Sequence, residues 1–139
     1  MGLETTHGCY GGPFSHFHRW RTEIGRVAGY PTTIHRVDFC GVRKLEEDLK
    51  IDQKVLRPNC AQGEWDHLPE DPLMVLLVHS DCDGRIKAAH CAPLADALEP
   101  LVPKLAGSAE DRRTDAGAAK AFIDGLRAAS AAGEDVEFF

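Results

Sequence analysis

Imidazole, hydroxyl, carboxylate and thiol groups gather within one short stretch near the middle of the chain. The stretch reads His79-Ser80-Asp81-Cys82-Asp83-Gly84, and the apolar run Leu73–Val78 leads directly into it. Reactive groups on a loop that follows a buried, rigid element are the usual arrangement of a binding or catalytic site. We therefore expect the functional site of this 139-residue protein in the loop 79–91.

This loop offers donor atoms for a metal ion. A calcium-binding loop has carboxylates at its first and last positions, where this chain has His79 and His90. Calcium prefers hard oxygen donors, whereas imidazole, thiolate and carboxylate together suit zinc or another transition metal. The candidate metal ligands are His79, Asp81, Cys82, Asp83 and His90. A metal-dependent hydrolase would use the metal to activate water, with His79, Asp81 and Asp83 as its catalytic groups.

The same residues also have a purely structural interpretation. Ser80, Asp83 and Gly84 are typical of a turn in which side-chain oxygens bond to backbone N–H groups. Cys82 is then a small apolar residue of the core. His79 follows an apolar run, so we expect it to be partly buried, and nearby carboxylates make it a candidate general base. Both interpretations stay open at the level of the sequence.

A second cluster of polar and aromatic residues lies near the N-terminus. On a helix, residues three or four apart share a face, which places His18 beside Arg21 and His16 beside Arg19 and Trp20. An aromatic ring next to a guanidinium can stack on a base and bind a phosphate. The predicted ligand-binding residues are His7, Cys9, Tyr10, His18, Trp20, Arg21 and Ser80. The alternative is that Trp20 belongs to the core and the arginines form a solvated face.

The composition narrows the classes of partner. The net charge of −6 disfavours binding along duplex nucleic acid. No stretch is apolar for long enough to span a bilayer, and the first residues lack the apolar run of a secretory signal. Five cysteines, an odd number without C-x-x-C spacing, favour reduced thiols in a cytoplasm. We expect a polar small-molecule partner and no membrane partner, and the expected oligomer is a homodimer, the commonest assembly.

The apolar pattern predicts an α+β fold, a mainly helical compact single domain over 1–139 with a few short strands. In the first half we expect a Gly-rich lead over 1–13, a helix over 14–28, a strand over 33–39 and helical turns over 45–49.

In the second half we expect a surface loop over 59–69 and a short helix, rather than a strand, over 73–78. A further helix should begin at Pro93 and be kinked or ended by Pro100 and Pro103. The C-terminal helix 114–132 has Thr114 as its N-cap and Gly133 as its stop. The last residues, 135–139, could add a short strand.

Three segments resemble a group of small proteins from bacteriophages and their bacterial hosts, for which no reaction is established. The segments are Gly2–Tyr10, which contains an H-x-C-[YW] motif, the central HSDCDG stretch His79–Gly84, and Phe122–Arg127. The resemblance implies a setting in the host cytoplasm and the binding or disabling of a host molecule, nucleotide immune signals included.

Three functions follow as hypotheses. The first is sequestration of a polar, phosphate-bearing small molecule such as a nucleotide signal, and the second is metal-dependent hydrolysis at His79, Asp81 and Asp83. The third is a non-enzymatic interaction with a host partner. The first two require the N-terminal segment to fold against the loop 79–91.

Overall fold

A computed structural model describes residues 2–50, 65–80 and 83–139. Within them the helices are α1 (Phe14–Val27), α2 (Met74–Leu77), α3 (Ala88–Leu98) and α4 (Asp115–Ala132), with 3₁₀ segments at Thr6–Gly8 and Glu99–Lys104. The strands are β1 (Gly2–Glu4), β2 (Gly11–Pro13), β3 (Thr32–Phe39), β4 (Val42–Leu49), β5 (Arg85–Ile86) and β6 (Val136–Glu137). The fold is α+β and mainly helical, which confirms the predicted class.

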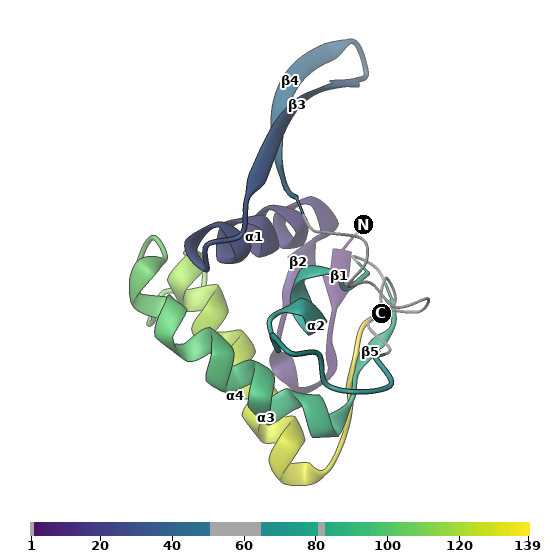
Figure 1. The fold of residues 1–139 in the computed structure, drawn as a ribbon, viewed down its shortest axis with the longest axis vertical. Coiled ribbons are helices and arrows are strands. Elements are labelled where there is room, and N and C mark those ends of the chain that lie inside the picture. Colours follow the sequence, from purple (N-terminus) through teal and green to yellow (C-terminus); the bar gives the residue numbers. More distant parts are fainter. Residues whose placement is uncertain (1, 51–64, 81–82) are drawn as a thin grey trace.

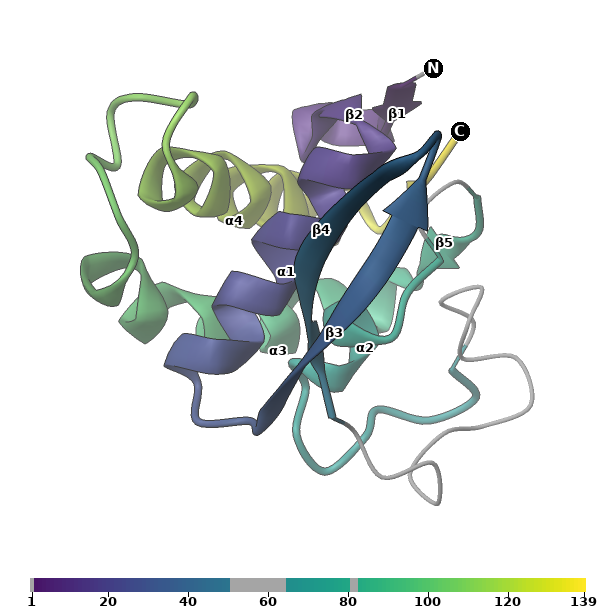
Figure 2. The same cartoon turned by 90° about the horizontal axis from the view of Figure 1, so that it is seen from above.

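The described strands form three separate antiparallel pairs, β1 with β2, β3 with β4, and β5 with β6. The β3–β4 hairpin is the longest, with a register that runs from Thr32 opposite Leu49 to Phe39 opposite Val42. This hairpin rises away from the rest of the molecule along its longest axis (Figure 1). We call residues 32–49 the arm. Seen from above, the arm crosses over α1 (Figure 2).

The core lies between α1 and the pair of helices α3 and α4, which pack side by side (Figure 1). Phe17, Trp20 and Ile24 recur at three- and four-residue steps on α1, so they share one face of the helix and are fully buried. The centroid of the Trp20 ring lies 5.3 Å from the centroid of the Phe122 ring on α4. The predicted helix over 14–28 is therefore confirmed, and its apolar face is core.

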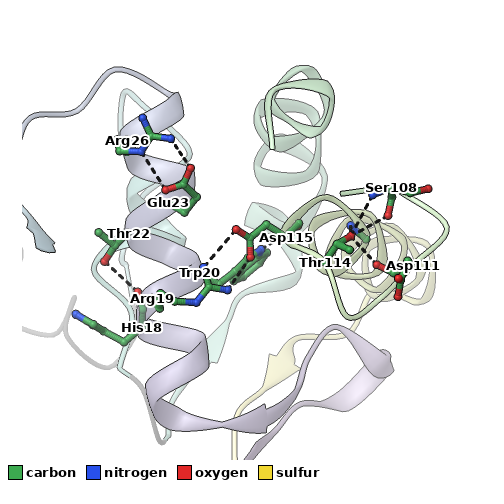
Figure 3. A network of polar contacts seen from close by, with 11 residues as sticks. His18, Arg19, Trp20, Thr22, Glu23, Arg26, Ser108, Asp111, Thr114 and Asp115 are labelled. Atoms are coloured by element: carbon green, nitrogen blue, oxygen red, sulfur yellow. Dashed lines mark hydrogen bonds and ion pairs between the residues drawn. The ribbon is translucent and has the colours of Figure 1, made fainter. Parts of the chain in front are cut away.

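Thr114 caps α4 as predicted. Its hydroxyl accepts a hydrogen bond from the Gly117 N–H at 3.2 Å and lies 2.7 Å from the Asp111 carbonyl oxygen, to which it donates. Gly133 follows the helix with φ 68°, a left-handed conformation that ends it without a Cβ clash. Arg19 of α1 forms two hydrogen bonds to the Asp115 carboxylate in the first turn of α4 (Figure 3).

The helical turns expected over 45–49 are wrong, because these residues belong to strand β4. Cys40 and Gly41 both have positive φ, 51° and 78°, which makes a tight turn and pairs β4 directly with β3. The acidic run Glu46–Asp48 has low strand propensity, and the pairing overrides it.

The loop expected over 79–91 is shorter than predicted. Strand β5 forms at Arg85–Ile86 by pairing with β6, and α3 begins at Ala88, before Pro93. Pro93 lies inside the helix, where its ring removes one N–H donor. The α-helix ends at Leu98 and the chain continues as a 3₁₀ segment through Pro100 and Pro103, as those prolines predicted.

The remaining element predictions have the following outcomes. Residues 2–13 of the predicted Gly-rich lead contain β1, a 3₁₀ segment and β2, elements that the sequence did not predict. The strands over 33–39 and 135–139 and the short helix over 73–78 are confirmed. Of the predicted surface loop, residues 59–64 lie outside the described residues, and 65–69 form neither helix nor strand. None of the helices in the described ranges combines the length and the apolarity needed to cross a membrane.

Candidate functional site

His79 follows helix α2, and its side chain lies in the protein interior with 3% of its surface exposed. Its ring stacks on Phe138, with the centroids 3.9 Å apart. Nδ1 lies 2.8 Å from the Ser80 carbonyl oxygen and Nε2 lies 3.3 Å from that of Arg85. Burial lowers the pKa of His79 to about 4, so the ring is neutral near pH 7 and donates one hydrogen. Both ring nitrogens therefore face backbone carbonyls, which favours a structural role for the imidazole.

The other predicted loop residues have mixed outcomes. Ser80 donates a hydrogen bond to the Asp83 carboxylate at 2.8 Å, a contact typical of a polar turn. His90 lies in the first turn of α3, where burial lowers its pKa. Asp81 and Cys82 lie outside the described residues.

The metal prediction gains no support from the residues that the structure describes. Among them, no three His, Cys, Asp or Glu side chains are close enough to hold an ion. Because Asp81 and Cys82 belong to the predicted ligand set, the metal site and the hydrolase hypothesis both stay predictions. No described observation favours them.

Most of the predicted N-terminal ligand residues are packed against other groups. Trp20 is buried and its indole N–H donates to the Asp115 carbonyl oxygen at 3.3 Å (Figure 3). Tyr10 is half-buried, and the centroid of its ring lies 4.9 Å from the centroid of the Phe17 ring. Burial raises the pKa of the Cys9 thiol to about 12, so it is an inert core residue. The alternative in which Trp20 belongs to the core therefore describes that residue better than a ligand site does, whereas its solvated arginine face is wrong for Arg21, which is buried.

Arg21 joins the two regions that the sequence singled out. Its guanidinium lies 4.6 Å from the centroid of the Phe17 ring and donates to the carbonyl oxygens of Leu76 and His79. Burial lowers its pKa to about 10, so it is still charged near pH 7. Arg21 therefore places the N-terminal cluster against His79, whereas the expected pocket between that cluster and the loop 79–91 stays a prediction, because Asp81 and Cys82 lie outside the described residues. The described contacts between them are packing and hydrogen bonds to backbone oxygens.

An open groove lies elsewhere, between α1 and the arm. Its volume is about 510 Å³. The lining residues are Phe14, Ser15, His16, His18, Arg19, Thr22 and Glu23 of α1 and Lys44, Leu45, Glu46 and Glu47 of β4. Successive side chains of a strand point to opposite faces. Because four consecutive residues of β4 line the groove, it opens along the edge of the strand.

His18 bridges this groove at the base of the arm. Its Nε2 lies 2.5 Å from a carboxylate oxygen of Asp48 on β4. His18 was predicted as a ligand residue, and it is the member of that set that lines this groove. His7 lies on another side of the fold, with Nε2 3.1 Å from the Glu134 carboxylate.

The arm exposes large apolar side chains that the sequence argument missed. Ile34 and Leu45 are 66% and 68% exposed, and Val42 at the tip is 62% exposed. Because helical turns were predicted over 45–49, the sequence argument did not recognise the hairpin that exposes these side chains. The signal that points to it is the alternation after Thr32 followed by Cys40-Gly41, a short turn between two runs of similar length.

Comparisons with models of protein families, with curated proteins and with solved structures found no match to this chain.

Proposed function

We propose that this protein acts by binding another polypeptide, without catalysis, through the outer edge of strand β4. The observation that supports this proposal is the unpaired edge of an exposed arm. Within residues 2–50, 65–80 and 83–139, β3 and β4 form a two-stranded sheet that no third strand extends. An exposed strand edge is a template for pairing with an added strand.

The hydrogen-bond pattern of the arm identifies which backbone groups face outward. The Lys50 N–H donates to the Pro31 carbonyl oxygen at 2.8 Å, next to the paired residues Thr32 and Leu49. Bonded and non-bonded pairs alternate along an antiparallel ladder. The even-numbered residues of β4 therefore bond to β3. The N–H and C=O groups of the odd-numbered residues Arg43, Leu45 and Glu47 point away from β3, toward the groove.

The base of the arm is held firmly on α1. A Cβ added to Gly25 would lie 2.5 Å from a methyl carbon of Leu49, so Leu49 packs directly on that glycine. The contact between His18 and Asp48 adds a polar tie between α1 and β4. A two-stranded hairpin is marginally stable in water by itself, and additional strands stabilise it. An arm that is fixed at one end and exposes Ile34, Val42 and Leu45 is suited to a partner strand.

The proposal corresponds to the third hypothesis from the sequence, an interaction protein. Its setting is the cytoplasm, as the cysteine count and the resemblance to phage and bacterial proteins suggest. The partner is defined by its chemistry: an extended backbone segment that supplies N–H and C=O groups to β4.

Amide hydrogen exchange followed by NMR tests this proposal residue by residue. In dilute protein, the amides of Arg43, Leu45 and Glu47 should exchange rapidly, while those of Lys44 and Glu46 are protected by β3. An excess of a synthetic strand peptide, with a Lys-rich half and a Glu-rich half, should then slow the exchange of the odd-numbered amides. The proposal fails if those amides are already protected in the monomeric protein, or if the peptide leaves their exchange unchanged.

A matched pair of variants isolates the backbone contact. Leu45→Pro removes an outward N–H, and proline is tolerated at an edge position whose N–H faces solvent. Leu45→Thr shortens the side chain and keeps the N–H. Peptide protection of Arg43 and Glu47 should be lost in the first variant and retained in the second.

A second candidate function is capture of a polar, phosphate-bearing small molecule in the same groove. Four basic or imidazole side chains line it: His16, His18, Arg19 and Lys44. These groups can bind phosphate oxygens, while Glu23 and Glu46 can accept hydrogen bonds from sugar hydroxyls or a base amine.

Calorimetry with a panel of nucleotides tests this second function. Binding that weakens about tenfold in Lys44→Ala supports it. A folded protein that gives no binding heat with any member of the panel rules it out.

A further inference from the structure

We infer that the strand bound by β4 is β4 of a second copy of this chain, paired antiparallel about a two-fold axis at Leu45. This inference rests on the proposed function, because it names the partner of the same edge. The arm exposes apolar side chains, and its charges are arranged so that the edge is complementary to itself. The sequence of the edge is Val42-Arg43-Lys44-Leu45-Glu46-Glu47-Asp48-Leu49, basic before Leu45 and acidic after it.

The outward-facing residues restrict the register of such a pair. Arg43, Leu45 and Glu47 must face odd-numbered residues of the second copy, since these have the outward N–H and C=O groups. In a symmetric pair, the axis then passes through one residue of β4. An axis at Lys44 or Glu46 would place identical charges opposite each other, as would an axis at Arg43 or Glu47.

An axis at Leu45 places opposite charges across from each other on both faces of the sheet. Arg43 then faces Glu47 of the second copy on one face, and Lys44 faces Glu46 on the other. Symmetry repeats each pair, so four opposite-charge pairs form around a central contact between the two Leu45 side chains. Of the symmetric registers centred on residues 43 to 47, this is the one in which no like charges face each other.

The apolar residues follow the same symmetry. Leu45 lies opposite Arg36, and Ile34 lies opposite Glu47, so Leu45 and Ile34 are diagonal neighbours on one face of the arm. Pairing at Leu45 joins this face to that of the second copy. The two exposed leucines and two exposed isoleucines then form one apolar strip across a four-stranded sheet, which explains their high exposure in a single chain.

Within one chain, the charges of the arm have weaker partners. Lys44 lies 3.3 Å from Glu46 and Arg43 lies 3.5 Å from Asp38, and all four side chains are at least one third exposed. Solvent-exposed ion pairs of this kind add little to stability. These side chains can therefore exchange partners when a second copy binds.

Sedimentation equilibrium on the full chain, in reductant, tests the inference. The wild-type protein should show a monomer–dimer equilibrium between about 1 and 200 µM. Lys44→Glu and Glu46→Lys each place two like-charge pairs at the interface, so each variant alone should dimerise at least about tenfold more weakly. An equimolar mixture of the two variants restores both opposite-charge pairs and should form a heterodimer about as tight as the wild type.

The heterodimer makes the result independent of any folding defect, because misfolded chains would not regain affinity on mixing. Lys104→Glu is the matched control, since it makes the same charge change at an exposed position away from the arm and should leave dimerisation unchanged.

A wild-type protein that stays monomeric across this range overturns the inference, and so does a mixture no tighter than its components. The two proposals remain distinguishable. A monomer whose odd-numbered β4 amides are protected by the synthetic peptide disproves self-pairing and supports the strand-binding function. A monomer whose amides the peptide does not protect disproves both.

Discussion

The buried guanidinium of Arg21 donates a hydrogen bond to the backbone carbonyl of His79, which connects helix α1 to the turn after α2. The same group lies over the Phe17 ring and reaches the Leu76 carbonyl oxygen at 3.4 Å. An arginine that the sequence placed among ligand-binding residues therefore satisfies the carbonyls at the end of a short helix. Buried carbonyl oxygens need such donors, because water does not reach them.

Replacing this arginine should destabilise the fold. Arg21→Met keeps much of the side-chain volume but leaves the carbonyls of Leu76 and His79 without this donor, at a cost of about 1–3 kcal/mol. Chemical denaturation measures the change. Arg26→Met, on the same helix, removes a surface contact to Glu23 and should leave the midpoint nearly unchanged. Equal midpoints for Arg21→Met and the wild type would contradict the role described for Arg21.

The burial of His79 predicts a specific dependence of stability on pH. The pKa is 6.5 in the unfolded chain and about 4 in the folded protein, because burial disfavours the charged ring. As the pH falls through this window, the unfolded chain takes up a proton that the folded protein does not. The free energy of unfolding should therefore decrease by about 3 kcal/mol from this group, and the loss should level off below about pH 4.

His79→Asn is the variant that isolates this effect, because its amide can still donate to the Ser80 carbonyl oxygen. The free energy of unfolding, measured by denaturation at each pH, should vary less with pH for the variant than for the wild type. The difference should be concentrated between pH 6.5 and 4. If the free energy of unfolding depends on pH equally in the variant and the wild type, another group causes the pH dependence. His90, whose pKa is also lowered, would be the first to test.

Gly125 allows the N-terminal segment to approach helix α4. A Cβ at this position would lie 2.5 Å from the Cys9 sulfur and 2.9 Å from the His7 carbonyl oxygen. Gly125→Ala should destabilise the protein by about 1–3 kcal/mol, since one of its clashes is with backbone, which cannot easily move. Gly11→Ala is the control, because a Cβ there meets nothing within 4 Å. Thermal unfolding that ranks the two variants equally would argue against this close approach.

A substitution in the turn at the tip of the arm should destabilise the arm without destabilising the rest of the protein. Cys40 has φ 51°, a conformation that asparagine tolerates and a β-branched residue does not. Cys40→Val should speed amide exchange in β3 and β4 and leave the thermal midpoint of the body nearly unchanged, because the arm projects from it (Figure 1). Cys40→Asn should preserve the exchange pattern. A large fall in midpoint for Cys40→Val would show that the arm and the body unfold together.

Local patterns in the sequence determined the elements with strong, self-contained signals. The spacing of Phe17, Trp20 and Ile24 predicted α1, and Thr114 with Gly133 predicted both ends of α4. Pro100 and Pro103 marked the end of a helix. These signals succeed because helix periodicity and capping depend on residues a few positions apart. The α+β class followed from them.

Tertiary structure decided what the polar residues do. Whether His79 is a reactive group or a packed ring depends on Phe138 and the Arg85 carbonyl, which reach it through the antiparallel pairing of β5 with β6. Whether 45–49 is helix or strand depends on pairing with 32–36, a non-local contact that outweighs the weak propensity of an acidic run. Residue types therefore specified which groups are available, and long-range packing determined which of them are buried and which remain exposed on the arm.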